Sequence, residues 1–261
     1  MTVENVLKIL EREVAPLKVS DDFCKKYSMY DNSGIIINCG KEVNGALFSL
    51  DFSSEAVKEA VKLGYNLIVT HHPAIYGGIS RLDLTSSAQA RAIAACLNGG
   101  ISVISMHLNF DAAPNGMDNF LMQGVCGKDF VALSSVDGGF YGRSYSVAPV
   151  ALSQLLSQIN ANFSTSALCH GMDGRTVKKV ASFCGAGCDD AAVNFAKEQK
   201  VDVVVSSDFG HHRILELVES GIAVIQLKHY AAENYGFNRI YRNISGKLQL
   251  PSQYFTDGRF L

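Results

Sequence analysis

Two adjacent histidines follow a short apolar run in the segment NLIVTHHPAIY, residues 66–76. The run from Asn66 to Thr70 predicts a buried strand, so His71 and His72 lie where that strand ends. Successive residues of an extended chain point to opposite faces, so the two imidazoles cannot easily bind one ion. Each of them can bind one of two neighbouring ions instead. Because such pairs also occur in loops and caps, a metal site requires further ligands elsewhere in the chain.

Two further predicted strands lead to a histidine that is followed four positions later by an acid, His107 with Asp111 and His229 with Glu233. If the segment HYAAEN opens a helix, His229 and Glu233 lie on the same side of it. Neutral imidazole and carboxylate suit zinc, iron(II) or manganese. Two such ions, about 3.5–4 Å apart, activate a water and polarise a substrate oxygen. The pattern therefore predicts two divalent ions per chain, and a site with one ion is the weaker alternative.

The strands that carry these residues belong to a pattern that occurs twice. Residues 54–70 and 190–206 each have the pattern of a helix followed by an apolar strand. A second helix and strand follow in each half, SSAQARAIAACLNGG with ISVISMHLNFD and HHRILELVESG with IAVIQLKHYAAEN. The sequence therefore predicts an α/β fold built from a duplicated helix-strand unit, with mixed, mostly parallel sheets flanked by helices. Ligands gather at the carboxyl ends of strands in such sheets, where these histidines and acids lie.

We expect two lobes. Residues 1–130 and 222–261 form lobe 1, which carries most of the metal ligands, and residues 131–221 form lobe 2. The stretch between the two copies is predicted to contain a helix from Ala148 to Ile159. The C-terminal tail LQLPSQYFTDGRFL is expected to cover a sheet edge or an interface.

Composition and charge argue against several classes of function. The chain has 261 residues, of which 48% are hydrophobic and 18% charged, so it can bury a sizeable core. Its formal net charge is −2 and it has no dense lysine or arginine run, so nucleic-acid binding has little electrostatic support. No apolar stretch approaches the roughly 20 residues needed to cross a bilayer, and no secretory signal is recognised. Seven scattered cysteines fit reduced thiols, so a soluble, cytoplasmic protein is expected.

Three other motifs are interpreted as structural. His211 and His212 lie where a helix begins, and we expect them on the surface or beside the metal ligands. The segment VASFCGAGCDD is similar to a phosphate-binding turn, but it lacks a third glycine and its two aspartates would repel an anion. Cys184 and Cys188 have no second pair nearby, so a zinc ribbon is not indicated.

Six segments follow one another in the order typical of one family. They are YDNSGI, VTHHPAIY, SMHLNFDAAPNGMDNFL, FYGRSY, VASFCGAG and KHYAAEN. On these motifs the chain resembles, from end to end, the Nif-three-like family of dinuclear-metal proteins, which includes homologues named type-two GTP cyclohydrolase I. The resemblance implies two intertwined α/β lobes from a duplicated unit. It also implies a ring-shaped homo-oligomer, commonly a hexamer, whose metals face an internal cavity.

The resemblance also implies a role for each ligand. His71 and His72 would each bind one metal ion. Asp111 would join one of these ions and His229 the other, while Glu233 would bridge the two.

His107 would then lie near the metals and transfer protons, which makes it the candidate catalytic residue. The chain departs from the family pattern at two places beside the ligands. Ser206-Ser207-Asp208 stands where Thr-Gly-Asp or Thr-Gly-Glu is usual, and Lys228 stands where a glycine usually precedes the histidine. Both departures leave the ligands in place, so they bear on substrate preference.

Two classes of function fit these observations. The first is a metal-dependent hydrolase that acts on a small molecule, with a nucleotide such as GTP as the candidate substrate. An aromatic or polar clamp for a purine cannot be located in the sequence. The second is a non-catalytic metal-binding scaffold or regulatory interaction protein, whose ions serve structure or metal handling.

Overall fold

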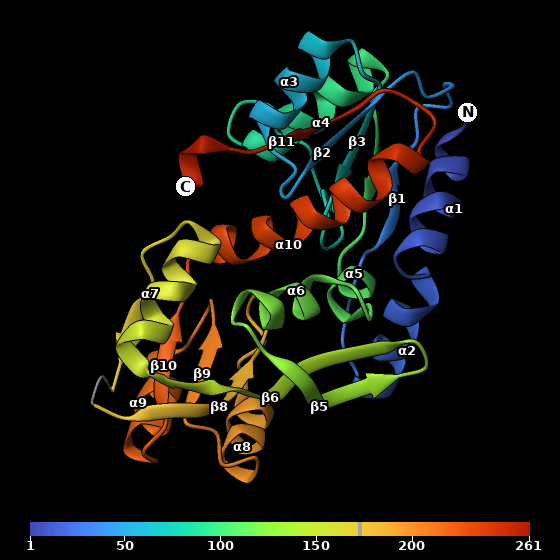
Figure 1. Ribbon diagram of the computed structural model, residues 1–261. Coiled ribbons are helices and arrows are strands. Elements are labelled where there is room, and N and C mark those ends of the chain that lie inside the picture. The colour runs from blue at the N-terminus through green and yellow to red at the C-terminus, as the bar shows by residue number, and fades with distance from the viewer. Residues whose placement is uncertain (172–173) are drawn as a thin grey trace. The chain divides into compact units, whose positions relative to one another are not determined.

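The computed structural model of the chain describes residues 1–171 and 174–261 (Figure 1). It has an α/β fold with two mixed sheets, which confirms the predicted fold class. The chain separates into two compact units. The first contains Met1–Phe110 and Phe237–Arg259, and the second contains Asp111–Gly236 and Phe260–Leu261. These boundaries differ from those of the expected lobes 1 and 2, whose assignment stays a prediction.

The sheet of the first unit has the strand order β1-β4-β3-β2-β11. Its strands are β1 (Gly34–Ile37), β2 (Ala46–Ser49), β3 (Leu67–Thr70), β4 (Ser102–Ser105) and β11 (Ser252–Phe255). Strands β2, β3, β4 and β11 run parallel, and β1 is antiparallel to β4. Strand β11 pairs with β2, so the C-terminal tail covers a sheet edge as expected.

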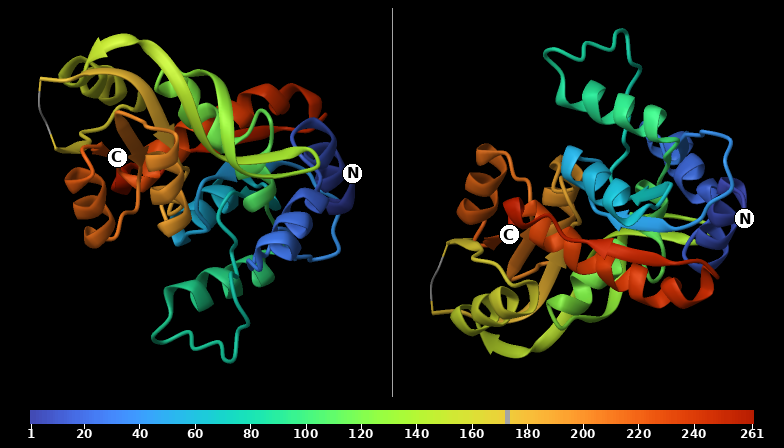
Figure 2. Two further views of the ribbon diagram at one scale, coloured as in Figure 1. Left: turned by 90° about the horizontal axis from the view of Figure 1, so that it is seen from below. Right: turned by 90° about the horizontal axis from the view of Figure 1, so that it is seen from above.

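The helices that begin in the first unit are α1 (Val3–Glu13), α2 (Leu17–Tyr27), α3 (Ser54–Leu63), α4 (Ala88–Gly99) and α5 (Leu108–Ala112). Helices α3 and α4 begin and end where their sequences predict. The hydroxyl groups of Ser53 and Ser87 accept hydrogen bonds from the first turns of α3 and α4. Gly64 and Gly100 end the two helices in the left-handed conformation that glycine adopts readily. The segment between β3 and α4 extends as a long loop from the elements of its own unit (Figure 2).

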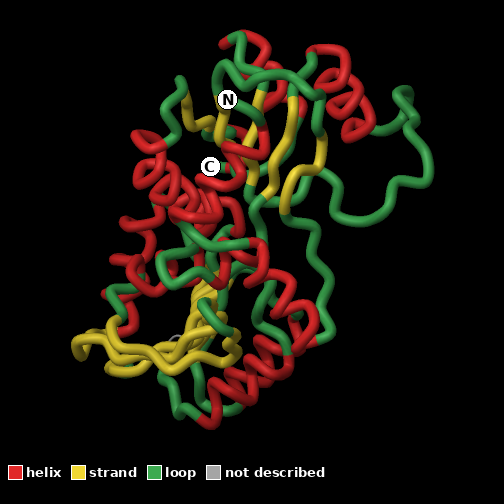
Figure 3. Tube along the Cα trace, turned by 90° about the vertical axis from the view of Figure 1, so that its right-hand side faces the viewer, coloured by secondary structure: helices red, strands yellow, loops and turns green. Residues whose placement is uncertain are grey.

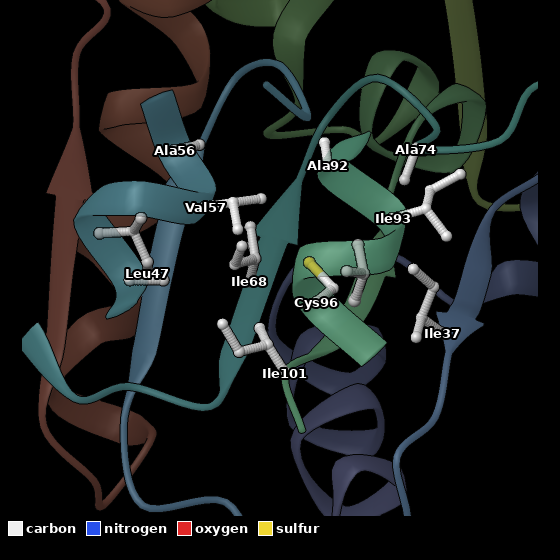
Figure 4. Packing of buried hydrophobic residues seen from close by; sticks show 12 residues of the cluster. Ile37, Leu47, Ala56, Val57, Ile68, Ala74, Ala92, Ile93, Cys96 and Ile101 are labelled. Carbon is white, nitrogen blue, oxygen red and sulfur yellow. The ribbon is translucent and has the colours of Figure 1, made fainter. Parts of the chain in front are cut away.

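Strands β2, β3 and β4 are buried along their whole length, which explains why their sequences are mostly apolar and carry only small hydroxyl residues at their ends. On one face of the sheet, Leu47 and Ile68 pack with α3 and α4 (Figure 4). On the opposite face, the ring of Phe48 lies 6.3 Å from that of Phe237, in the second half of α10 (His229–Ile244). Burial on both faces fixes the strand ends, where the candidate site residues lie.

The sheet of the second unit has the strand order β5-β6-β8-β9-β10-β7. Its strands are β5 (Lys128–Val136), β6 (Gly139–Ala151), β7 (Leu168–His170), β8 (Thr176–Ser182), β9 (Val203–Ser206) and β10 (Ala223–Gln226). The remaining helices are α6 (Met117–Gly124), α7 (Leu152–Phe163), α8 (Asp190–Glu198) and α9 (His211–Glu219), with short 3-10 turns at Ser245–Lys247 and Gly258–Phe260. Strands β8, β9 and β10 are parallel, and β5 and β6 form a long hairpin (Figure 3).

The helix predicted from Ala148 to Ile159 is wrong at its start. Strand β6 continues to Ala151, and α7 begins at Leu152. After an irregularity that follows Ser146, β6 regains its pairing with β8 at Val150 and Ala151. Pairing with β8 therefore outweighs the helical pattern of the apolar residues at this point.

The predicted duplication has a clear counterpart in the topology. In the first unit β2-α3-β3-α4-β4 forms three parallel strands, and β8-α8-β9-α9-β10 does the same in the second. The N–H of Met106 donates to the carbonyl of Thr70 at 2.9 Å, and the N–H of Leu227 donates to that of Ser206 at 2.9 Å. When the two repeats are matched at these equivalent bonds, His107 of the first repeat corresponds to Lys228 of the second. His229 therefore lies one position later in its repeat than His107 does. The two His-x-x-x-acid segments are therefore not equivalent positions of the repeat.

Two expectations from composition concern the cysteines and the membrane. The seven cysteines, all within the described residues, form no disulfide bond with one another, and Cys96, Cys184 and Cys188 are buried. In the described part of the chain, no helix combines the length and apolar character needed to span a membrane. The cytoplasmic location stays a prediction.

Candidate metal centre

Three histidines gather in the first unit, just beyond the carboxyl ends of β3 and β4. One ring nitrogen each from His71, His72 and His107 lies within 4.8 Å of the others. The ring centroid of His71 is 4.9 Å from that of His72 and 5.1 Å from that of His107. The strict alternation of side chains no longer holds here, because β3 ends at Thr70 and the N–H groups of both following residues donate to the carbonyl of Leu50. The adjacent histidines can therefore serve one ion or two neighbouring ions.

Each of these three imidazoles is held by an oxygen atom at its Nδ1. For His71 the partner is a backbone carbonyl oxygen at 3.0 Å. For His72 it is a carboxylate oxygen of Asp51 at 2.6 Å, and for His107 a carboxylate oxygen of Asp31 at 2.7 Å. An ionised carboxylate and a carbonyl only accept, so Nδ1 carries the proton and Nε2 has the lone pair that can bind a metal.

Asp31 is the most strongly held of these acids. Besides the contact with His107, it accepts hydrogen bonds from the hydroxyl groups of Ser20 at 2.5 Å and Ser33 at 2.6 Å. Burial alone would raise the pKa of Asp31, but the hydrogen bond and charge of His107, with the two hydroxyl groups, hold the pKa of this carboxyl well below its usual range. Asp31 is therefore ionised at neutral pH and keeps the ring of His107 in one orientation.

A separate group of candidate ligands lies in the second unit and consists of Asp111, His229 and Glu233. Nε2 of His229 is 2.8 Å from a carboxylate oxygen of Glu233, one turn along α10, as the four-residue spacing predicts. The Nδ1 of His229 is 2.7 Å from a carboxylate oxygen of Asp208. A carboxylate oxygen of Asp111 lies within 4.8 Å of one of Glu233, and both side chains are buried. The second unit therefore brings together one imidazole and two buried carboxylates.

The turn between β8 and α8 forms a wall against Glu233. The thiol of Cys184 is 3.6 Å from Oε1 of Glu233. A Cβ atom on Gly185 would lie 2.6 Å from the same oxygen, and Gly185 has a φ of +56°. The hydroxyl of Ser206 donates to the carbonyl of Phe183 at 2.7 Å and so ties the turn to the end of β9. The turn was interpreted as structural, and the structure adds that a side chain at Gly185 would require the carboxylate of Glu233 to move.

The thiol of Cys184 and the hydroxyl of Tyr141 are buried beside the acids of the second unit. Burial, with the charge of Glu233 next, raises the pKa of the Cys184 thiol well above its ordinary value. The hydroxyl of Tyr141 donates to the carbonyl of Cys184 at 2.6 Å, and burial, with the charge of Asp111 next, raises the pKa of Tyr141 as well. Cys184 is therefore a thiol at neutral pH.

A buried ion pair joins α6 to β6 in the second unit. Nε of Arg143 is 2.7 Å from a carboxylate oxygen of Asp118, and neither side chain is exposed. The guanidinium also donates to Asn119 at 3.2 Å and lies 4.1 Å from the centroid of Phe130. Burial raises the pKa of Asp118 to about 6, although the charge of Arg143 acts in the opposite direction. The segments GMDN and FYGRSY thus supply the two halves of this pair.

Comparison with known proteins assigns the chain to a family. The profile of Duf34/NIF3 (NGG1p interacting factor 3) matches residues 1–256. The chain belongs to this family. A GTP cyclohydrolase 1 type 2 homolog of Clostridium perfringens is 25% identical to it over 239 residues, which cover 89% of this chain and 87% of that protein. NGG1-interacting factor 3 of Saccharomyces cerevisiae is 26% identical over 230 residues, which cover 78% of this chain and 79% of that protein.

A solved structure shows the same fold. The crystal structure of hypothetical protein SA1388 of Staphylococcus aureus matches with a TM-score of 0.83 at 21% identity, and the match covers 98% of this chain and 97% of that one. The predicted resemblance to the Nif-three-like family is therefore confirmed. The structure of this NIF3 family member contains groups of histidine and acidic side chains that can bind a metal ion.

Sequence reasoning did not assign the aspartates that hold the histidines of this NIF3 protein. Ser49, the last residue of β2, pairs with Thr70, the last residue of β3. Asp51 lies two residues beyond Ser49, and His72 lies two residues beyond Thr70. Asp208 follows β9 in the same way. The signal that could have found these two acids is an aspartate that closely follows a buried strand. Because the neighbouring strands are parallel, such an aspartate lies beside the end of the next strand, where the histidine is.

Two features outside the ligand set have surface positions. His211 and His212 begin α9 and are exposed, in agreement with the expected surface position. Lys228, at the position where the family usually has glycine, is exposed, and its Nζ is 3.5 Å from the carbonyl oxygen of Leu261. In this NIF3 protein the lysine therefore contacts the C-terminal residue of its own unit.

Proposed function

We propose that this NIF3 family member is a cytoplasmic, metal-dependent hydrolase with two divalent metal ions per chain. Its donor set consists of imidazole nitrogens and carboxylate oxygens, which fit zinc, iron(II) or manganese. The proposed assembly is a homohexamer, as the family resemblance implies. The proposed ligands are His71, His72, Asp111, His229 and Glu233.

The observation that carries the proposal is the way in which the histidines are held. Nδ1 is bonded to an oxygen atom in each of them, and in three cases that oxygen belongs to a carboxylate. Proteins use this arrangement to fix the tautomer and the orientation of metal-binding histidines. A histidine that only fills a core does not require a carboxylate on Nδ1. The four histidines are His71, His72, His107 and His229.

The proposed roles follow from the donor types. His71 and His72 would each hold one ion, Asp111 and His229 would complete the two sets, and Glu233 would contribute one oxygen to each ion. Divalent ions held there would polarise a substrate oxygen and lower the pKa of a nearby water.

His107 is the proposed catalytic residue. Its side chain is partly exposed, and its Nδ1 is held by the ionised Asp31. Nε2 is then the nitrogen that accepts a proton from the attacking water and returns it to the leaving group. The proposed substrate is a small molecule, and GTP is the candidate because relatives are named GTP cyclohydrolase 1 type 2 homolog. Hydrolytic opening of the purine ring would release formate.

A second candidate function is a metal-binding scaffold or regulatory partner. It is favoured by the name of the yeast relative, NGG1-interacting factor 3, which describes a protein that contacts another protein. In this case the ions would stabilise the fold, and a fully metallated sample would be inert toward nucleotides, phosphoesters and amides.

Metal quantification with matched variants tests the proposal. Protein purified without a chelator is expected to contain two ions per chain by elemental analysis, and to release formate from GTP. Glu233→Gln is expected to lower the ion content and abolish formate release with the fold intact by circular dichroism. Glu216→Gln is the control, because Glu216 is an exposed acid of α9 that pairs with Lys197. About one ion per chain would favour a single-metal site, and a fully loaded but inert protein would favour the scaffold.

A further inference from the structure

Two exposed tyrosines lie beside the histidines of the first unit. Tyr76 is 51% exposed and Tyr30 is 57% exposed. The ring of Tyr76 meets that of His107 edge to face, with centroids 6.1 Å apart and an interplanar angle of 87°. The ring of Tyr30 meets that of Tyr76 at 5.4 Å and 82°. An aromatic surface that is more than half exposed therefore begins in contact with the proposed catalytic histidine.

The same short segment that orients His107 also fixes this surface. The hydroxyl of Tyr76 donates to the backbone carbonyl of Tyr30 at 3.1 Å. The side-chain amide of Asn32 donates to the carbonyl of Ile75, next to Tyr76, at 2.5 Å. Asp31, between these two residues in the sequence, holds Nδ1 of His107. Residues 30–32 therefore set the position of the tyrosine rings relative to the imidazole.

Packing does not explain two rings at this position. Tyr76 belongs to the long loop between β3 and α4. Among the described residues, its ring is not one of the side chains packed on the buried cluster that contains Ile68. Figure 2 shows this loop extending from its unit. Exposed aromatic side chains next to candidate catalytic groups are typical of ligand-binding surfaces. Every heterocyclic base has a π-face that can stack on a tyrosine, whatever groups its edges carry.

We propose that Tyr76, with Tyr30 against it, forms a stacking surface that holds a planar nitrogen heterocycle next to His107. This inference rests on the proposed function, because it names the part of the substrate that the hydrolase recognises. Ring stacking supplies affinity and places the edge of the heterocycle toward the imidazole. The surface is the aromatic clamp that a purine substrate requires.

Binding of monophosphates tests the stacking surface without reference to turnover. Guanosine, adenosine and cytidine monophosphates are titrated into the metal-loaded full chain by calorimetry, with ribose 5-phosphate as the base-free control. At least one of the three nucleotides is expected to bind about tenfold more tightly than ribose 5-phosphate. Tyr76→Leu is expected to reduce this ratio to near one, Tyr30→Leu to reduce it in part, and Tyr76→Phe to preserve it.

The matched control is Tyr27→Leu. Tyr27 is a tyrosine of the same unit that is 37% exposed, and its ring packs on Phe23 at 5.5 Å. This variant is expected to keep the wild-type ratio. Thermal unfolding of each variant separates a loss of the ring from a loss of the fold.

The outcomes separate this inference from the proposed function. If no nucleotide binds more tightly than ribose 5-phosphate, or if Tyr76→Leu keeps the wild-type ratio, the stacking surface is refuted. The ion content of the same samples is measured in parallel. If the affinity ratio depends on the base and is lost in Tyr76→Leu, the stacking surface is supported. If the same samples contain fewer than two ions per chain, the dinuclear centre is contradicted.

Discussion

Replacement of Gly185 by alanine is the sharpest test of the role of Glu233 as a ligand. A Cβ atom at this position would lie 2.6 Å from Oε1 of Glu233, whereas ordinary contacts begin near 3.4 Å. The carboxylate must therefore move by the difference, 3.4 − 2.6 = 0.8 Å, unless the turn itself moves. Metal–ligand distances tolerate changes of only about 0.2 Å. A displacement of this size is expected to reduce the affinity for zinc by about 10–100-fold.

The backbone conformation adds a separate effect that requires a control. Gly185 has a φ of +56°, and a left-handed conformation costs a residue with a Cβ about 1–2 kcal/mol. Gly221, in the same unit, has a φ of +77°, and a Cβ there would meet no atom within 4 Å. Gly221→Ala therefore carries the same conformational cost without a contact at Glu233. The two variants should lose similar amounts of stability when metal-free, and only Gly185→Ala should lose zinc affinity.

The assay is a competition titration with a chromophoric zinc chelator on metal-free protein, together with urea unfolding of the same samples. Equal zinc affinity in Gly185→Ala and Gly221→Ala would refute the reasoning. It would mean either that Glu233 is not a ligand or that its carboxylate can move by this distance without leaving the ion.

Two further predictions concern the pH dependence of stability at buried acids. The pKa of Asp118 is raised from 3.8 to about 6, so the folded state holds this proton more tightly than the unfolded state does. The free energy of unfolding of the wild type should therefore fall by about 2 kcal/mol relative to Asp118→Asn as the pH rises from 4 to 7. Urea unfolding at several pH values measures this difference, and a relative stability that rises instead would mean that the charge of Arg143 outweighs burial. The pKa of Asp31 is lowered, so its contribution is present above the unfolded pKa of about 4 and is lost as the pH falls below it. Asp31→Asn should therefore be less stable than the wild type at pH 7, with a difference that shrinks below pH 4; a difference that does not change with pH would contradict the assignment.

Asp31 and the two tyrosines beside His107 could not be found in the same way as the ligands. Asp31 and His107 are separated by 76 positions in the chain, and they meet because β1 runs antiparallel to β4, so that the start of one strand lies beside the end of the other. No local pattern contains that pairing. Tyr30 and Tyr76 are separated by 46 positions, and their contact likewise depends on how the segments before β1 and after β3 fold together.

The sequence by itself determined the α/β class, the duplicated helix-strand unit and the histidines and acids at strand ends. These follow from local periodicity, caps and turn residues, which act over a few neighbouring positions. It did not determine where β6 ends, because pairing with β8 overrides the helical pattern there. Nor did it determine which aspartate holds which histidine, or that Gly185 lies against the carboxylate of Glu233. Only the tertiary structure decided these points, because each depends on contacts between segments that are distant in sequence and that the packing of strands and helices brings together.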